Sequence, residues 1–256
     1  METQPINTTE SNDKKEIIVI VAIGLIFIIC ICCLLAVAGY FLVNDLNSPS
    51  KYETGTTPEA IIATSQPTSE KTLFEDNFDA NTNQWTEGTF EDQYGKTIFK
   101  INGNYTWDVV AEKAVNQKSW AENAPTVKDF IASVDATHVS GAENASYGIL
   151  FRVKDTDNLY YFAISDVGYY YTGSLIDGKW TTLIDWTETP NIHANALNTL
   201  KVKGIGDELT FYINDIVVDR LQDNAHTEGT TGIAVEIYDA GDKSNFEFDN
   251  FILTTP

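Results

Sequence analysis

Residues 144–186 read NASYGILFRVKDTDNLYYFAISDVGYYYTGSLIDGKWTTLIDW. Four short runs rich in Tyr, Phe, Ile, Leu and Trp are separated by the segments DTDN, SDVG and DG. Such runs, bounded by Asp, Asn and Gly, are typical of strands joined by tight turns. The stretch therefore predicts a meander of consecutive antiparallel strands. Its dense tyrosines also make it the first candidate for a binding surface.

Short alternating runs continue on both sides of this meander, from Thr72 to the end of the chain. The predicted strands are 72–78, 97–101, 105–111, 130–137, 147–154, 159–165, 169–175, 180–185, 198–203, 209–213, 216–221, 231–238 and 244–254. Asn214-Asp215 predicts a hairpin turn, because both residues tolerate positive φ and apolar strands flank them. Many short strands without helical periodicity predict an all-β fold, a sandwich or jelly roll of two antiparallel sheets.

Composition limits the classes of function. The chain has 256 residues, a formal charge of −21 and a pI of about 4.3. A nonspecific nucleic-acid binder needs clustered Lys and Arg for phosphate contacts, so this class is excluded. The three cysteines are Cys30, Cys32 and Cys33, all within one apolar run. The rest of the chain therefore has no disulfide, cysteine-ligated metal or cysteine nucleophile.

That apolar run, residues 17–43, contains no charged residue. A helix needs about 20 apolar residues to cross the hydrocarbon core, so the run predicts a transmembrane helix in contact with membrane lipid. Lys14 and Lys15 precede it, which predicts a cytoplasmic tail at 1–16 and an extracellular C-terminal part. A cleaved signal peptide is the alternative, because Ala36-Val37-Ala38 resembles a cleavage site.

Residues 44–71 are rich in Ser, Thr, Pro and charged residues. This composition cannot bury enough apolar surface to offset its ordering entropy, so it predicts a flexible linker. The remaining residues, 72–256, are numerous enough to form one domain with a two-sheet core. The expected order is therefore tail, transmembrane helix, linker and one extracellular domain, a single-pass arrangement in the cell membrane.

A resemblance to a known family rests on short motifs spread over residues 72–256. The motifs are FEDNFD at 74–79 with Trp85, GILFR at 148–152, DNLYYF at 157–162, DGKW at 177–180, LTFYIN at 209–214 and FDNF at 248–251. Together they resemble the concanavalin A-like lectin/glucanase domains of bacterial surface proteins. They are also similar to the DUF1080-type, 3-keto-disaccharide hydrolase-like branch of that superfamily. The resemblance implies a jelly roll whose first and last strands lie side by side. It leaves activity open, because the superfamily holds enzymes, lectins and adhesion modules.

Catalytic groups are sparse in the sequence. The resemblance implies a Glu-x-Asp-x-x-Glu strand in a glucanase, and the nearest match is Glu247-Phe248-Asp249, which has Ile252 at the last Glu position. Glycoside hydrolysis usually needs two carboxylates beside the scissile bond. The histidines His138, His193 and His226 are far apart and are expected in turns or on the surface. We therefore predict no catalytic residue.

Calcium is the better metal candidate. Asp79, Asn81 and Asn83 place oxygen-bearing side chains at alternate positions, as loops that bind hard cations do. The alternative is a turn in which these side chains satisfy backbone groups. A structural calcium ion held by these residues is therefore one of two readings of this loop.

Sugar binding needs an aromatic platform beside polar groups. If Phe151 and Phe162 face the core, alternation sends Arg152 and Tyr161 outward. Tyr169 and Tyr171 share a face, and Trp180 follows in the next run. The five predicted binding residues are Arg152, Tyr161, Tyr169, Tyr171 and Trp180. Trp85, Trp107 and Trp120 are expected to pack in the interior.

The sequence favours a membrane-anchored cell-surface recognition module that binds carbohydrate without catalysis. Its expected partner is a polysaccharide or envelope glycan. Two alternatives stay open: a glycoside hydrolase acting on a modified sugar, and an adhesion or envelope-structural module without a small ligand. The facing of the tyrosines and carboxylates decides between them.

Overall fold

The computed structural model describes residues 70–256. The predicted tail, the transmembrane helix at 17–43 and the linker up to residue 69 fall outside this range. In the part that is described, no helix is long and apolar enough to span a bilayer. The membrane anchor therefore stays a prediction from the sequence.

Fifteen strands make up the described part of the chain. They are β1 (Thr72–Asp76), β2 (Gly88–Asp92), β3 (Gly95–Ile101), β4 (Tyr105–Ala111), β5 (Val115–Ser119), β6 (Phe130–Gly141), β7 (Ser146–Asp155), β8 (Asn158–Ser165), β9 (Tyr169–Ile176), β10 (Lys179–Glu188), β11 (Asn198–Ile205), β12 (Glu208–Ile213), β13 (Ile216–Gln222), β14 (Thr230–Ile237) and β15 (Lys243–Thr254).

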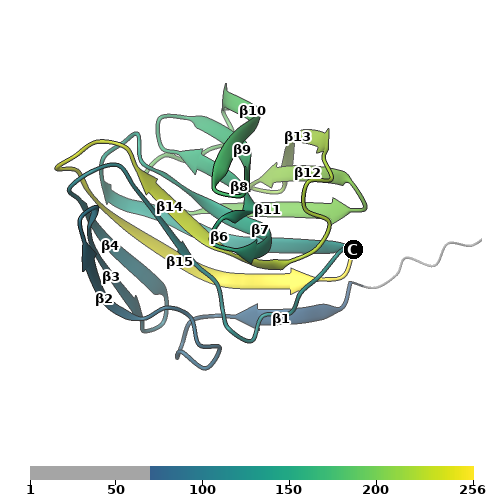
Figure 1. The fold of residues 1–256 in the computed structure, drawn as a ribbon, viewed down its shortest axis with the longest axis horizontal. Coiled ribbons are helices and arrows are strands. Elements are labelled where there is room, and N and C mark those ends of the chain that lie inside the picture. The colour runs from purple at the N-terminus through teal and green to yellow at the C-terminus, as the bar shows by residue number, and fades with distance from the viewer. Residues whose placement is uncertain (1–69) are drawn as a thin grey trace, which may run out of the picture. The chain divides into compact units, whose positions relative to one another are not determined.

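The strands form two antiparallel sheets (Figure 1). Sheet A has nine strands in the order β13-β12-β11-β6-β15-β4-β3-β2, with β1 paired to β15 beside this path. Sheet B has six strands in the order β10-β9-β8-β7-β14-β5. The chain crosses between the sheets several times, as in a jelly roll. The predicted all-β fold of two antiparallel sheets is confirmed.

Most of these strands were predicted from the sequence. The meander is β7 to β10, in which each strand pairs with the next. The predicted hairpin joins β12 to β13, and Asn214 and Asp215 both have positive φ, 51° and 64°. The first and last strands lie side by side, with Thr72 opposite Thr254 and Asp76 opposite Phe251.

Two strands were missed because they carry little hydrophobic signal. All five residues of β2 are exposed, and β5 buries only its two end residues. Each lies at the edge of its sheet. An edge strand is held mainly by backbone hydrogen bonds to one neighbour, so its sequence need not alternate.

One core fills the space between the sheets. Sheet B contributes alternate residues of its central strands, among them Tyr147, Ile149, Phe151, Tyr160 and Phe162, and sheet A contributes Trp107, Phe130, Phe211, Phe246 and Phe248. Each is nearly fully buried, and burial of one large apolar side chain contributes about 1.5–3 kcal/mol. Trp85 and Trp107 lie in this core, as predicted. The inward faces are therefore committed to stability, which leaves the outward faces for binding.

Candidate functional site

The outward face of sheet B holds the candidate site. Residues between the core positions of each strand point to this side, because successive side chains alternate. Cross-strand pairing arranges them in rows. The serine row is Asn116, Glu236, Ser146, Ser165 and Tyr169, and the alanine row is Lys118, Ala234, Gly148, Ala163 and Tyr171. Strands β5, β14, β7, β8 and β9 thus each contribute one residue to each row.

Aromatic rings stand on the β9–β10 side of this face. Trp186 stacks on Tyr171, with ring centroids 5.2 Å apart and 29° between the ring planes. Trp186 is 37% exposed and Tyr169 is 36% exposed. They form part of a groove of about 370 Å³, lined by Asn144, Ser165, Val167, Tyr169, Trp186 and Tyr238. The walls are mainly apolar, with amide and hydroxyl groups among them.

A hydrogen-bonded polar cluster lies beside the groove, and we define it as Asn116, Ser146, Glu236 and Tyr238. Oε1 of Glu236 accepts a hydrogen bond from Asn116 Nδ2 at 2.6 Å. Oε2 accepts one from the Tyr238 hydroxyl at 2.9 Å and a longer one from Ser146 Oγ at 3.4 Å. Tyr238 belongs to both the cluster and the groove wall. The carboxylate is therefore fixed in place beside Tyr238, whose side chain lines the groove.

Two tyrosines of this face, Tyr161 and Tyr238, remain protonated at neutral pH. Burial raises the pKa of the Tyr238 phenol well above its ordinary value, and the Glu236 charge raises it further. Burial likewise raises the pKa of Tyr161, again with a contribution from Glu236. Both hydroxyls are therefore hydrogen-bond donors. Exposed rings beside fixed donors and acceptors can bind a pyranose, which has an apolar C–H face and hydroxyl groups at its edge.

Four of the five predicted binding residues lie on this face, at different depths. Tyr169 lines the groove, and Tyr171 lies beside it, stacked on Trp186. Tyr161 is fully buried beneath the surface, in a second apolar cluster with Leu150, Ala163 and Trp120, and donates a 3.2 Å hydrogen bond to Ala234 O. Trp180 is 43% exposed but pairs with Leu175, toward the other end of β9. It does not line the groove.

Arg152 is the exception, and the predicted outward direction of its side chain is wrong. Its φ of 48° and the register shift after Phe151 form a bulge in β7 that breaks the alternation. The guanidinium is buried and donates to the carbonyls of His226 at 3.0 Å and Lys128 at 3.3 Å, and to the carbonyl of Gly206. Arg152 thus joins three loops from inside the sandwich.

The loop with the predicted calcium ligands uses its side chains locally. Asn81 accepts from Trp85 N at 2.8 Å and donates to Trp85 O at 3.0 Å. Asn83 donates to Asp76 Oδ2 at 2.8 Å, and Asp79 accepts from Asn77 at 2.7 Å. Asp76 also accepts from Phe78 N at 2.8 Å and Trp85 Nε1 at 2.9 Å.

These bonds fit the turn reading of the loop. No group of three or more His, Cys, Asp or Glu side chains suited to a metal ion occurs within residues 70–256. The oxygens that a calcium ion would need already accept N–H donors. In this arrangement the side-chain oxygens of the loop do not fit a calcium ion. The calcium site stays a prediction, which titration of the protein with calcium can test.

The carboxylates of the glucanase-like motif lie on the other sheet. Glu247 and Asp249 are on β15, whose Phe246 and Phe248 point into the core. The strand pairs with β6, β4 and β1 in the middle of sheet A. These two carboxylates are therefore separated from the groove by the thickness of the sandwich.

Two histidines differ from expectation, because His138 and His226 are buried and not on the surface. His138 Nδ1 lies 3.0 Å from Asp166 Oδ2, and Tyr147 donates to the other oxygen of Asp166 at 2.9 Å. His226 Nε2 lies 2.8 Å from Leu175 O. Both hold loops to the core and do not face the groove.

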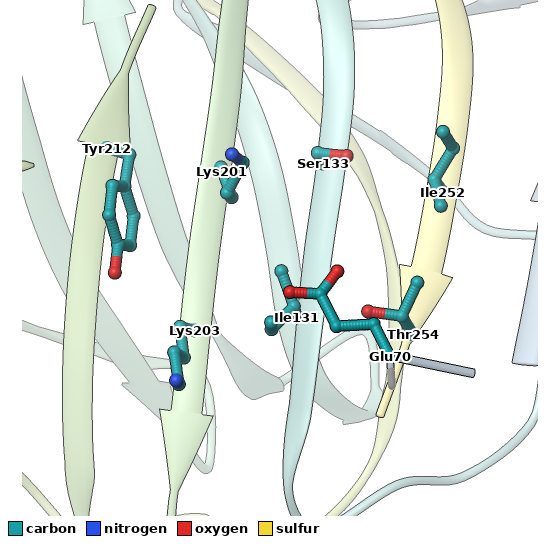
Figure 2. A pocket seen from close by; sticks show the side chains of 8 residues that line it. All are labelled: Glu70, Ile131, Ser133, Lys201, Lys203, Tyr212, Ile252 and Thr254. Atoms are coloured by element: carbon teal, nitrogen blue, oxygen red, sulfur yellow. The ribbon is translucent and has the colours of Figure 1, made fainter. Parts of the chain in front are cut away.

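A second groove, of about 340 Å³, lies on the outward face of sheet A (Figure 2). It is lined by Glu70, Ile131, Ser133, Lys201, Lys203, Tyr212, Ile252 and Thr254. Apart from Glu70, which precedes β1, these side chains come from β12, β11, β6 and β15 (Figure 2). Lys201 pairs with Asp215 and lies 5.6 Å from the Tyr212 ring centroid. This surface is charged and has one aromatic ring, so it lacks a stacking platform.

Sequence reasoning missed Trp186, Glu236, Tyr238 and Asn116 as site residues. Glu236 and Tyr238 could have been found, because both alternate with the apolar residues of the predicted strand 231–238. Asn116 was out of reach because β5 was not predicted. Trp186 lies within the second register shift of β10, between Ile184 and Thr187, where alternation no longer predicts which way a side chain points.

No protein-family model and no curated protein matches the chain. Similarity to solved structures is clear. Carbohydrate binding module CBM66 from Bacillus subtilis has a TM-score of 0.50 and 20% identity, over 68% of this chain and 98% of that module. The endo-β-galactosidase from Clostridium perfringens that releases GlcNAcα1-4Gal has a TM-score of 0.53 and 11% identity, over 75% of this chain and 64% of that enzyme.

A third similar structure is an endo-acting O-glycanase from the human gut microbiota, with a TM-score of 0.51 and 10% identity, over 73% of this chain and all of that one. These likenesses confirm a two-sheet jelly-roll fold. At 20% identity or less they establish the fold alone. The narrower resemblance to the DUF1080 branch stays a prediction.

Proposed function

We propose that residues 70–256 form a carbohydrate-binding domain that holds a glycan against the outward face of sheet B. The observation that carries this proposal is the exposed Trp186–Tyr171 stack beside a groove that also contains Tyr169 and Tyr238. The rings offer an apolar surface to the C–H face of a sugar. The neighbouring hydroxyl, amide and carboxylate groups can bind its hydroxyls.

We propose that this binding is noncatalytic. On the outward positions of β7, β8, β9 and β14 in the described structure, Glu236 is the single carboxylate. Retaining hydrolysis usually needs two carboxyl groups about 5–5.5 Å apart, and inverting hydrolysis needs about 6.5–9.5 Å. The centre of the face offers one such group, which favours recognition over cleavage.

The similar solved structures support a function related to sugars. One is a carbohydrate-binding module and two are enzymes that act on glycans. Because both kinds share the fold, the choice between them rests on the residues of the face. The single central carboxylate supports the proposal that this chain is a binding module.

The setting that we propose for this domain is the cell surface. The apolar run at 17–43 and the lysines before it support a single-pass anchor with the C-terminal domain outside. The polar segment at 44–71 would then act as a tether between membrane and domain. The partners of the chain would be membrane lipid at one end and an envelope or environmental polysaccharide at the other.

A glycan array probed with the full-length protein in detergent tests the proposal. We expect binding to at least one polysaccharide, and we expect Trp186→Ala to weaken it about tenfold, since a stacked aromatic anchor contributes on the order of 1–2 kcal/mol. Tyr212→Ala on sheet A is the matched control and should bind like the wild type. An array without any signal would refute the proposal.

The same samples separate the two alternatives. Release of reducing ends from a bound glycan would show that the protein is a hydrolase and refute the noncatalytic part. Association with an envelope protein combined with a blank array would favour the adhesion module. Glycan binding without product release is the result that we expect.

A further inference from the structure

The polar cluster beside the groove carries an inference about which sugars the domain selects. Glu236 stands in the serine row, which leads from Asn116 on the edge strand β5 through Ser146 and Ser165 to Tyr169. Three strand spacings separate Glu236 from Tyr169, a distance of about 14 Å. A sugar chain stacked on the rings can therefore extend along this row to the carboxylate.

The cluster fixes the carboxylate as an acceptor. An ionised carboxylate has about four acceptor positions. Asn116 and Tyr238 occupy two of them, while Ser146 Oγ lies 3.4 Å from Oε2 and 2.9 Å from the Tyr238 hydroxyl. No Lys or Arg in residues 70–256 lies within 4 Å of Glu236 as an ion-pair partner. Oε1 therefore keeps an acceptor position that none of these contacts uses, and a sugar hydroxyl can donate to it.

The neighbouring charges favour a neutral donor. Asp239 stands beside Asn144 at the groove rim, where it accepts a 3.3 Å hydrogen bond, and Glu188 lies opposite Tyr169. Lys118, in the alanine row, contributes a positive charge to the outward face of sheet B. Burial lowers the pKa of Lys118, while Glu236 acts in the opposite direction. This side thus carries three carboxylates and one partly buried ammonium, and the net negative charge disfavours a carboxylated or sulfated sugar.

We propose that Glu236 is the specificity-determining residue of this face, which accepts hydroxyl hydrogen bonds from a neutral glycan and disfavours acidic ones. This inference rests on the proposed carbohydrate binding. Asn116, Ser146 and Tyr238 are positioning residues that hold the carboxylate. A hydroxyl donating to an ionised carboxylate forms a stronger bond than one between neutral groups. A uronic acid at the same place would set two like charges against each other.

The experiment compares matched neutral and acidic polymers. Full-length protein in detergent is titrated with glucan, galactan and mannan, and with polyglucuronate, polygalacturonate and polymannuronate. Wild type should bind at least one neutral polymer, and more tightly than its acidic counterpart. Glu236→Gln should bind that neutral polymer about tenfold more weakly. The difference in affinity between the neutral polymer and its acidic counterpart should become smaller.

Two further variants complete the test. Tyr238→Phe removes one hydroxyl that positions the carboxylate, and an intermediate loss of affinity is expected. Glu208→Gln is the matched control, since it removes the same charge from an exposed position of β12 in sheet A, and it should stay within twofold of wild type. Unfolding curves confirm that each variant folds.

The outcomes separate this inference from the proposed function. If Glu236→Gln binds the neutral polymer like the wild type, or if wild type prefers the acidic polymer, the inference is overturned while carbohydrate binding stands. If wild type binds none of the six polymers or the array glycans, both fail. A selective loss with Glu236→Gln and no change with Glu208→Gln supports the inference.

Discussion

The two outward faces of the sandwich differ although the backbones behind them are alike. On sheet B, aromatic rings stand beside small residues and a fixed carboxylate. On sheet A, lysines, isoleucines and one tyrosine are spread over four strands. Both sheets send their other residues into one shared core. The fold is thus set by the inward positions, and what the domain can bind is set by the outward ones.

The faces also differ in depth. On the outward side of sheet B lies a second apolar cluster, in which Leu150, Tyr161 and Ala163 are fully buried. Ala163 is the cross-strand partner of Tyr171, so the cluster borders the ring stack. On sheet A, Lys201 and Lys203 alternate with core residues of β11 without such a layer. A packed apolar layer beside a binding site reduces the ordering cost of binding.

The largest effect is expected from Arg152, which tests whether it belongs to the scaffold or to the binding face. Arg152→Met should lower the free energy of unfolding by on the order of 3 kcal/mol, because several buried carbonyls lose their donor. Denaturant titration measures this change. The folded fraction should keep its glycan affinity. Unchanged stability together with lost affinity would restore the binding role suggested by alternation.

A pair of glycine substitutions separates the platform from the core. A Cβ at Gly173 would lie 2.3 Å from the Tyr171 hydroxyl oxygen, so the tyrosine ring must move and its stack on Trp186 is disturbed. Gly173→Ala should weaken glycan affinity by about threefold, equivalent to part of one aromatic pair. Stability should change little, since the ring end is free to shift. Calorimetry gives the affinity.

Gly204 is the matched position on sheet A. A Cβ there would lie 2.7 Å from the Phe130 ring, inside the core. Gly204→Ala should destabilise the domain by about 1–3 kcal/mol through overpacking, and affinity should remain unchanged. The reverse pattern for the two glycines would contradict the assignment of the faces.

A small effect is expected from the outward face of sheet A. The double variant Lys203→Ala and Tyr212→Ala should bind glycan within twofold of wild type, because both side chains point away from sheet B. Its stability should change by at most about 1 kcal/mol, as is usual for surface positions. A loss of glycan binding measured on the array would show that the site lies on sheet A.

The smallest effect is expected from calcium. A specific site at one hundred times its Kd would add about 2.7 kcal/mol, which is a rise in Tm of roughly 5–10 °C for a domain of this size. The oxygens of Asp76, Asn81 and Asn83 already accept N–H donors. We therefore expect a Tm shift below about 1 °C with millimolar calcium. A shift of several degrees that EDTA reverses would establish the predicted site.

Much of the fold could be predicted from the sequence, because buried strands carry period-two patterns. The meander and the Asn214-Asp215 hairpin needed nothing more. The missed strands β2 and β5 lie at sheet edges and carry no such pattern. Pairings between strands that are distant in sequence, such as β14 with β5 and β7, could not be predicted, because local sequence patterns carry no information about them.

The site could be predicted only in part, because alternation predicts the direction of a side chain only where the strand is regular. Tyr169 and Tyr171 lie on a regular strand, and alternation placed them correctly. Arg152 itself has left-handed backbone in the bulge of β7. Its side chain therefore points inward, although alternation predicted it on the surface. Glu236 lies on the outward face because β14 belongs to sheet B, and two of its three polar partners, Asn116 and Ser146, lie 90 or more residues away in sequence.

The pairing of β1 with β15 has a consequence for engineering. Lys71 N donates to Thr255 Oγ1 at 3.0 Å, and Thr255 N donates to Lys71 O at 2.9 Å. The two ends of the domain therefore lie next to each other, away from the outward face of sheet B. A short linker between them would give a circular permutant, and the domain could be inserted into a surface loop of another protein as a glycan-binding graft.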